Sequence, residues 1–299
     1  MKSIPDTMDI SVIIVTYQTA DLIIPCLESV FGNRGCDFEV HIVDNASTDQ
    51  TLDFIRQGFP DVHLIANTSN RGFSAANNQA LRNCRGEFIL FLNPDTQVKP
   101  DTFTRSLAYM RKVPHVGLGG PKILNPDGSL QESISYRYPG EKYGKKNLPP
   151  MKGTIACVLG AAMVARREAI DGIGGFDEDF FLYGEDEDLC LRIRKTGWEI
   201  GFIEEAVVVH LGGYSERTTV SAEKWRKKVR AEYLFYTKHY RPETIARIRR
   251  MERMKARWRL LSLAFTLPFA NNKDRIQEKM SRYGVILEET RRVSSADRR

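Results

Sequence analysis

The stretch Phe88-Ile89-Leu90-Phe91-Leu92-Asn93-Pro94-Asp95 joins five apolar residues to a turn that ends in an acid. An unbroken apolar run is typical of a strand that is buried on both faces of a parallel sheet. Residues 10–15 form a nearly continuous apolar run as well, and further strands are expected at 38–43 and 62–66. Stretches with helical spacing follow these strands at 21–31, 52–59 and 72–82. Strands that alternate with helices in this way predict an α/β fold with a mostly parallel central sheet.

The later part of the chain has a different pattern. Turn-forming residues dominate residues 121–152, which we expect to form a long mobile loop region, a common place for a lid over a binding site. Short strands are expected at residues 198–203 and 206–210. After about residue 220 the pattern is helical to the end, with breaks near Pro242 and Pro268.

The composition is typical of a soluble globular protein, since 42% of the 299 residues are hydrophobic and 27% are charged. The five cysteines are scattered and never form a CxxC pair, which argues against a disulfide framework or a zinc site and favours a reducing compartment. We identify no signal peptide and no apolar run near the roughly 20 residues of a membrane span. These features predict a cytoplasmic protein.

Charge divides the chain into two regions. Residues 221–299 carry 22 Lys and Arg against 9 Asp and Glu, whereas residues 1–220 carry 22 against 29. The net charges are therefore +13 and −7, which indicates regions with different partners. We expect a catalytic domain at residues 1–220 and a basic helical region at residues 221–299.

Polar residues follow the first two strands, at the edge where open α/β sheets bind ligands. Thr16 and Tyr17 end the first strand, and a turn there with an aromatic ring is compatible with a bound nucleotide. Asp44 follows the second strand, and its carboxylate is able to accept the N3–H of uracil or thymine. An ordinary strand-to-helix turn explains Thr16 and Tyr17 equally well, and position alone does not decide the role of Asp44.

The segment before the third helix has the features of a phosphate site. Gly72 permits close approach of the backbone, the helix N-terminus favours an anion, and Arg71 is able to contact phosphate directly, with Asn70 beside it. A capped helix start with an incidental surface arginine is the alternative.

The turn after the fourth strand has the features of a metal site. A diphosphate leaving group needs its charge neutralised, and a divalent cation with oxygen ligands does this. Asp95 stands at the rigid end of a central strand, with Asn93 nearby. On these residues alone, a turn that is braced by Asp95 is the simpler explanation.

Four consecutive acids, residues 185–188, open a helix behind the aromatic residues Phe180 and Phe181. Like charges near apolar rings raise the pKa of at least one carboxyl group, which suits a general base. A solvated acidic turn is the alternative. His210 ends the last apolar strand, and the glycines after it would let a loop close over a phosphate, although a lone histidine at a strand end is more often structural than a ligand.

Taken in order, these segments resemble the family 2 glycosyltransferases of the GT-A fold, especially the bacterial rhamnosyltransferase-like branch. The resemblance covers residues 9–215 and does not extend over the last third of the chain. The matching segments are residues 11–17, 43–49, 70–73, 91–95, 174–178 and 181–192, followed by His210.

The resemblance implies a donor site at the strand ends. Asp44 would bind the pyrimidine of a dTDP- or UDP-sugar. The other residues that are expected to contact this nucleotide-diphospho-sugar are Thr16, Tyr17, Asn70, Arg71 and Asn93. The branch favours dTDP-rhamnose as the donor, with UDP-hexoses next.

The resemblance also implies a metal and a base. Asp95 would be the last acid of the family's DxD motif and would hold Mg²⁺ or Mn²⁺, although Asn93 here replaces the first acid of that motif. His210 would approach the metal or the diphosphate. Asp186, beside Glu185, would be the general base in a single inverting displacement.

The implied activity is that of a hexosyltransferase of cell-envelope polysaccharide biosynthesis, acting on a glycan or lipid-linked glycan acceptor. A sugar-phosphate nucleotidyltransferase is one alternative, but it usually has a glycine-rich loop and a basic residue where this chain has Thr16-Tyr17-Gln18-Thr19. A nucleic-acid-binding protein that uses the basic tail is another. The net charge of residues 1–220 opposes a phosphate track, so we expect no nucleic acid partner.

Basic and apolar residues mix at helical spacing in residues 221–270, and we expect some of the apolar ones to share one face. These are Ile245, Ile248, Met251 or Met254, Trp258, Leu261 and Phe265. A basic amphipathic helix with Trp and Phe is typical of an element on a membrane surface, which suits a lipid-linked acceptor on the inner face of the cell membrane. The alternative is packing against the catalytic domain or a second subunit, so a homodimer stays open.

Overall fold

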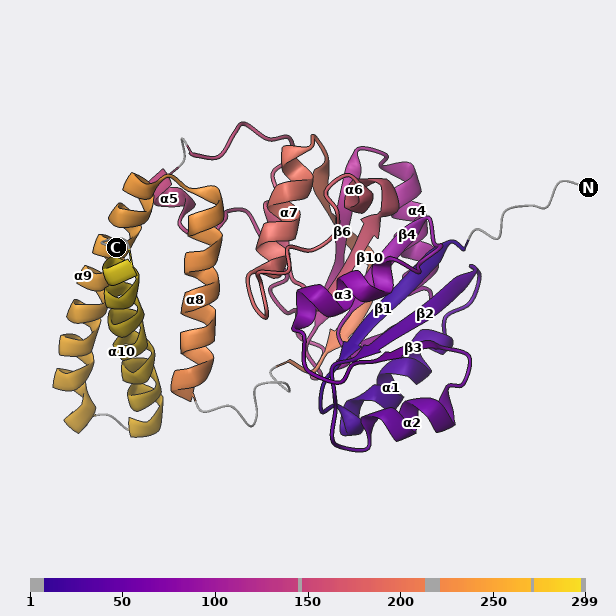
Figure 1. The fold of residues 1–299 in the computed structure, drawn as a ribbon, viewed down its shortest axis with the longest axis horizontal. Coiled ribbons are helices and arrows are strands. Elements are labelled where there is room, and N and C mark those ends of the chain that lie inside the picture. The colour runs from indigo at the N-terminus through magenta and orange to yellow at the C-terminus, as the bar shows by residue number, and fades with distance from the viewer. Residues whose placement is uncertain (1–7, 145–146, 213–220, 270–271, 297–299) are drawn as a thin grey trace, which may run out of the picture. The chain divides into compact units, whose positions relative to one another are not determined.

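The computed structural model describes residues 8–144, 147–212, 221–269 and 272–296 (Figure 1). The chain divides into two units. The first contains the described residues up to Tyr138 and from Pro150 to Gly212, and the second contains Pro139–Pro149 and the helices from Ser221 onward. The short segment Pro139–Pro149 thus groups with the C-terminal helices, which the sequence pattern did not indicate.

An eight-stranded sheet forms the centre of the first unit, in the order β3-β2-β1-β4-β9-β6-β10-β5. Neighbours among β1 to β4 are parallel, and β6 is parallel to β10. β9 lies antiparallel between β4 and β6, and β5 pairs antiparallel with β10 at the edge. The expected α/β fold with a mostly parallel sheet is confirmed. The strands are β1 (Ile10–Thr16), β2 (Phe38–Asp44), β3 (His63–Ala66), β4 (Phe88–Leu92), β5 (Thr96–Val98), β6 (Val116–Leu124), β9 (Ala162–Arg166) and β10 (Glu199–His210).

Side chains that alternate along the strands form a hydrophobic layer on each face of the sheet. On one face, Ile14 of β1 and Leu92 of β4 belong to the same buried cluster as Leu27. On the other, the ring of Phe91 meets Phe176 edge-on, with ring centroids 4.9 Å apart. The helices of this unit are α1 (Ala20–Phe31), α2 (Thr51–Gly58), α3 (Phe73–Leu81), α4 (Thr102–Lys112), α6 (Arg167–Asp171) and α7 (Glu185–Lys195).

Residues 121–152 contain more regular structure than expected. The strand β6 continues to Leu124, the short strand β7 (Ile134–Ser135) pairs with β8 (Cys157–Val158), and helix α5 (Glu141–Gly144) follows in the second unit. The prediction of two short strands between residues 198 and 210 is also wrong. Both belong to β10, whose pairing with β6 shifts register between Ile203 and Val207, so that the apolar pattern is interrupted within one strand.

Three long helices form most of the second unit, and α10 (Lys273–Ala296) packs against both α8 (Ser221–His239) and α9 (Pro242–Thr266). Arg230 on α8 pairs with Glu289 on α10 at 2.9 Å. Tyr240 donates its hydroxyl hydrogen to the carbonyl of Pro139 at 2.7 Å, which ties the segment Pro139–Pro149 to the helices of this unit. Within the described residues, every helix is too short or too polar to cross a bilayer.

The expected shared face of α9 does not include Ile248. Ile248 is fully buried, whereas Trp258, Leu261 and Phe265 are exposed. At 3.6 residues per turn, position 258 lies about 80° around the helix from position 248, so the two residues do not face the same neighbours.

A buried carboxylate joins β1 and β2 near the start of the parallel strands. Ser11, which pairs with Glu39 in the register of these strands, donates its hydroxyl hydrogen to Glu39 Oε1 at 2.7 Å. Arg85 donates its backbone N–H to the same oxygen at 2.6 Å and its Nε–H to Oε2 at 3.0 Å. Burial alone would raise the pKa of Glu39, but the hydrogen bonds from Ser11 and Arg85 outweigh it and lower the pKa to about 2.

The lowered pKa of Glu39 predicts that the stability of the fold depends on pH. A lowered carboxyl pKa stabilises the fold above the ordinary value of 4.5, and the stabilisation is lost as the pH falls toward about 2. We expect Glu39→Gln to lower the free energy of unfolding at pH 7 by about 3 kcal/mol and to cost less at pH 3. Urea denaturation at both pH values measures this. A penalty as large at pH 3 as at pH 7 would contradict it, and Glu28→Gln on the exposed side of α1 is the control.

Candidate active site

Asp44 is held in place where β1 and β2 end. The two strands are parallel and pair Thr16 with Asp44, so both residues reach the same edge of the sheet. Thr16 donates its hydroxyl hydrogen to Asp44 Oδ2 at 2.9 Å, and the backbone N–H of Ser47 donates to Oδ1 at 2.9 Å. The Asp44 carboxylate is fully buried, whereas Tyr17 beside it is 48% exposed. The structure thus brings Thr16 and Asp44 into direct contact.

The segment before α3 is tied to the same edge of the sheet. The side-chain amide of Asn45 donates to the carbonyl of Gly72 at 3.0 Å. Gly72 has a φ of +84°, and a Cβ there would lie 2.8 Å from the Phe181 carbonyl oxygen, so this position requires glycine. Asn70 accepts the Gly72 N–H at 2.9 Å, and the Arg71 side chain lies exposed. Phe73 donates its backbone N–H to the carbonyl of Phe181 at 2.8 Å, which joins this segment to the loop before α7.

Asp95 and His210 lie next to each other, because β5 follows the turn after β4 and pairs antiparallel with the end of β10. Asp95 Oδ1 is 3.4 Å from His210 Nε2, and both side chains are largely buried. The other ring nitrogen, Nδ1, lies 2.9 Å from Gln131 Oε1. If Nδ1 donates to this amide oxygen, the Nε2 lone pair faces Asp95.

This pair fits a cation site. A neutral imidazole nitrogen and a carboxylate oxygen at this separation gain nothing from each other directly, but both are ligands that a divalent cation accepts. The backbone N–H of Asn93 donates to the carbonyl of Ala161 at 2.9 Å, and the backbone carbonyl of Asn93 accepts the Thr96 hydroxyl hydrogen at 2.6 Å. The glycine-rich loop expected to close after His210 lies mostly outside the described residues, since residues 213–220 are not described.

The four acids that open α7 have different surroundings. Asp186 Oδ2 accepts the backbone N–H of Gly160 at 3.0 Å, and its Oδ1 accepts the N–H of Glu187 at 3.0 Å. Burial raises the pKa of Glu185 to about 8, and the adjacent Asp186 adds to the rise. Asp188 is buried and pairs with Arg192 at 2.6 Å. Glu185 thus has the raised carboxyl pKa that the sequence predicts, and Asp188 is buried, whereas Glu185, Asp186 and Glu187 are partly exposed.

Backbone contacts connect Asp186 to the turn that carries Asp95. Gly160, which donates to Asp186, directly precedes Ala161, which accepts the N–H of Asn93. This linkage exists because β9 lies antiparallel beside β4 and begins at the end where β4 stops. The sheet therefore gathers the donor-site candidates, the cation-site candidates and the acids of α7 along one edge.

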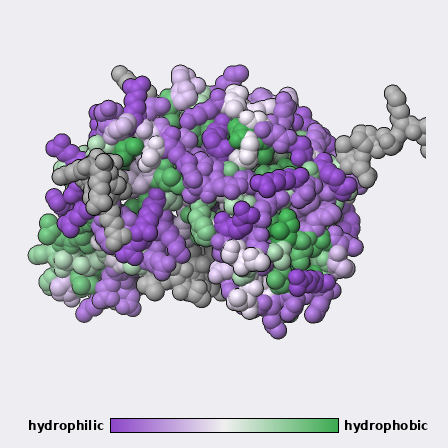
Figure 2. Space-filling view, in the orientation of Figure 1, coloured by the Kyte–Doolittle hydropathy of each residue, from purple (hydrophilic) through white to green (hydrophobic). Residues whose placement is uncertain are grey.

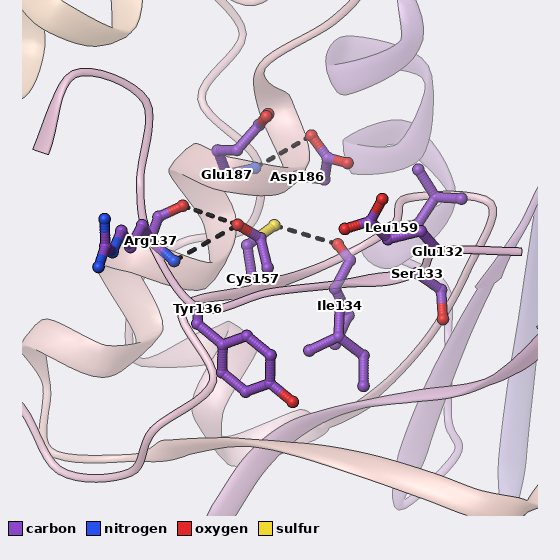
Figure 3. A pocket seen from close by; sticks show the side chains of 11 residues that line it. Glu132, Ser133, Ile134, Tyr136, Arg137, Cys157, Leu159, Asp186 and Glu187 are labelled. Carbon is purple, nitrogen blue, oxygen red and sulfur yellow. Dashed lines mark hydrogen bonds between the residues drawn. The ribbon is translucent and has the colours of Figure 1, made fainter.

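An open pocket of about 630 Å³ lies beside the start of α7 (Figure 3). Its walls come from residues 132–137, residues 157–159 and the first turn of α7. Figure 3 shows Tyr136 across the pocket from Asp186. A molecule that enters this pocket would meet the carboxylate of Asp186 at its wall.

Sequence analysis missed several residues of this region. Gln131 and Gly160 were not singled out, and neither was the pocket lining around Cys157. No local motif marks these residues. They are brought to the site by contacts across 79 positions of sequence for Gln131 and 26 for Gly160.

One further group of metal-ligand types lies in the described residues, at Glu39, His41 and His63. The Glu39 oxygens already accept hydrogen bonds from Ser11 and Arg85, and an arginine cation beside them opposes a second cation. The rings of His41 and His63 stack with centroids 4.6 Å apart, which does not aim two nitrogens at one ion. These contacts favour a structural role for the group.

Comparison with known proteins identifies the family. The profile of the family described as Glycosyl transferase family 2 matches residues 11–174. An N-acetylglucosaminyl-diphospho-decaprenol L-rhamnosyltransferase of Mycobacterium tuberculosis is 29% identical over 234 residues, which are 68% of this chain and 76% of that protein. A low-salt glycan biosynthesis hexosyltransferase of Haloferax volcanii is 27% identical over 219 residues, or 68% of this chain and 67% of that one.

Solved structures share the fold. A mannosyltransferase of Pyrobaculum calidifontis, in complex with GDP-Man and Mn²⁺, has a TM-score of 0.61 at 19% identity, covering 94% of this chain and 86% of that chain. Residues 1–349 of TarS from S. aureus have a TM-score of 0.53 at 18% identity, covering 95% and 92%. Since the family profile spans more than half of the chain, the protein belongs to glycosyl transferase family 2 and is a glycosyltransferase of the GT-A fold.

Proposed function

We propose that this glycosyltransferase moves a hexose, rhamnose foremost, from a pyrimidine nucleotide-diphospho-sugar to a hydroxyl group of a glycan or lipid-linked glycan, with inversion. One observation carries the proposal: Asp186 is fixed by Gly160 at a pocket wall, on the sheet edge that also bears Asp95 and His210. The M. tuberculosis relative is named as a rhamnosyltransferase of a lipid-diphospho acceptor, which supports this donor and acceptor class.

Donor recognition begins at the ends of β1 and β2. Asp44 Oδ1 accepts one backbone hydrogen bond and keeps capacity for a second, which the N3–H of uracil or thymine would supply after the segment that buries Asp44 moves aside. A purine that presents an acceptor at this position would be rejected, because two acceptors would face each other. The exposed ring of Tyr17 would cover the base, Asn70 would order the loop, and the exposed Arg71 would contact phosphate.

Asp95 and His210 would hold a divalent cation, Mg²⁺ or Mn²⁺, with Asn93 close to the diphosphate. Such an ion would neutralise the charge that develops on the departing nucleoside diphosphate. Gln131 would keep the imidazole of His210 turned so that Nε2 faces Asp95. With Asn93 in place of a second acid, Asp95 is the single carboxylate of this turn, and we expect modest affinity for the ion alone.

Asp186 would act as the general base. As the acceptor oxygen forms its bond to the anomeric carbon, Asp186 takes the hydroxyl proton, and the bond between that carbon and the diphosphate oxygen breaks. Glu185 supports this role, because its pKa of about 8 keeps it protonated at neutral pH and adds no second negative charge beside Asp186. The two N–H groups that bond to Asp186 fix the direction of its carboxylate.

Residues 1–220 would carry this chemistry, and residues 221–299 would place the enzyme on the inner face of the cell membrane. The lipid-linked acceptor class supports this location. A homodimer through the helices is the competing use of the same region. In the described residues, nothing favours a nucleotidyltransferase or a nucleic-acid-binding protein over the family assignment.

Asp186→Asn tests the base. We expect the substitution to lower kcat by about 10²–10⁴-fold, because the amide cannot accept the acceptor proton, while the affinity for the nucleotide stays unchanged. Release of nucleoside diphosphate measures turnover, and calorimetry measures binding. The exposed acid Asp171, substituted to Asn, is the matched control. Turnover at about a tenth of wild type or better would remove Asp186 from this role.

Asp95→Ala tests the cation site. The wild type should bind dTDP or UDP more tightly with Mg²⁺ or Mn²⁺ than without, because Asp95 and His210 would hold an ion that neutralises the diphosphate charge. In the variant this difference should vanish in calorimetry, whereas Asp127→Ala in an exposed turn should keep it. A variant that retains the full metal dependence would show that the ion binds elsewhere.

A further inference from the structure

The C-terminal half of α9 carries a row of exposed apolar side chains, which we call the α9 stripe: Met251, Met254, Trp258, Leu261 and Phe265. Their spacing of three, four, three and four residues places them along one side of the helix. Trp258 is 61% exposed, Leu261 72% and Phe265 78%. Phe269, in the 3₁₀ turn that follows (Leu267–Phe269), is 83% exposed and extends the row past the helix end.

The exposure of these residues is not a general feature of α9. Thr244, Ile248 and Ala256 are its buried positions, so the helix has a separate face that packs inside the unit. Figure 2 shows apolar side chains gathered over the lower end of α9, at the left of the view. A contiguous exposed apolar patch of this kind marks a binding surface, whereas isolated exposed residues do not.

Cationic side chains border the α9 stripe. Arg250, Arg253 and Arg257 line a shallow groove of about 370 Å³ beside Met254. Lys255 and Arg259 follow on the other flank of the helix. From Arg253 to Phe269 the sequence has no acid, so every charged side chain that this part of α9 contributes is positive.

The positive charges beside the α9 stripe distinguish between two binding partners, a second copy of the chain and an anionic bilayer. If a second copy of the chain packed stripe to stripe, the arginine flanks would face each other, and like charges at such flanking positions oppose pairing. An anionic bilayer instead offers phosphate groups to the guanidinium groups and acyl chains to the apolar side chains. Because α9 is not a spanning helix, the contact would be with one leaflet.

We propose that the α9 stripe and the 3₁₀ turn after it insert into the surface of an anionic lipid bilayer, with Arg250, Arg253 and Arg257 on lipid phosphates. The inference deepens the proposed membrane location by assigning it to one surface. Trp258 would enter the interface between headgroups and acyl chains, where its ring is typically found. Donor binding in the first unit does not depend on this contact.

Co-sedimentation with vesicles tests the surface. The full chain should bind vesicles of phosphatidylglycerol and phosphatidylcholine at low salt, bind pure phosphatidylcholine weakly, and dissociate as the salt concentration rises. Phe265→Glu should weaken binding to the anionic vesicles by about tenfold or more, since it places a carboxylate in an apolar environment. The matched control is Gln277→Glu, which makes the same charge change at an exposed position of α10.

Fluorescence adds a readout of position. Emission of the wild type should shift to the blue with anionic vesicles, and Trp258→Phe should lose this shift while it keeps vesicle binding. Equal binding of wild type and Phe265→Glu would overturn the proposal. So would a wild-type dimer, seen by sedimentation velocity without lipid, that Phe265→Glu converts to a monomer.

Nucleotide calorimetry separates this proposal from the proposed function. The Phe265→Glu variant should bind dTDP or UDP with Mg²⁺ as tightly as the wild type in vesicle-free buffer, which shows that the first unit is folded. A wild type that binds vesicles but no nucleotide would contradict the proposed function alone. A wild type that binds nucleotide but no anionic vesicle would contradict the α9 surface alone.

Discussion

The site depends on the parallel pairing of β1 with β2 and with β4. In this register Thr16 lies opposite Asp44, and Ile14 lies opposite Leu92, so the polar residues that follow each strand leave the sheet at one edge. Antiparallel neighbours would have sent the same residues to opposite edges. The buried Glu39 accepts hydrogen bonds from Ser11 and Arg85 nearer the other end of these strands, which adds a side-chain link between β1 and β2.

Two antiparallel strands complete the site. β9 brings Gly160 and Ala161 to the end of β4, so that one short segment contacts both Asp186 and Asn93. β5 reverses direction after the turn of Asp95 and pairs with β10, which delivers His210 to the same place. Three of the four acids of α7 then differ by their contacts. Backbone N–H groups fix Asp186, burial raises the pKa of Glu185, and Asp188 pairs with Arg192.

Local patterns predicted the first half of the fold well. The four expected strands agree with β1 to β4 to within a residue. For β1 and β4 the reason is that strands buried on both faces leave nearly continuous apolar sequence. The same reasoning failed where regularity is broken, as in β10, whose register shift interrupts the pattern. The spacing of α9 located the shared side of its exposed apolar residues but wrongly placed Ile248 there, and Ile248 is buried.

The sequence predicted the site residues that stand at the ends of strands and helices, but it did not predict the residues that support them. Asp44, Asp95, Asp186 and His210 stand at the ends of recognisable elements, and their order along the chain carries the family resemblance. Gln131 contacts His210 across 79 residues, from a segment that the sequence indicated only as a loop. Such contacts are set by the sheet order, which a single sequence does not reveal.

The central claim is that the strand ends form one nucleotide and cation site around Asp95. Anomalous diffraction from crystals grown with UDP and Mn²⁺ tests it most directly. A manganese peak is expected about 2.0–2.3 Å from an Asp95 carboxylate oxygen and from His210 Nε2, with the diphosphate beside it. A peak at Glu39, His41 and His63, or a nucleotide bound away from Asp44, would contradict it.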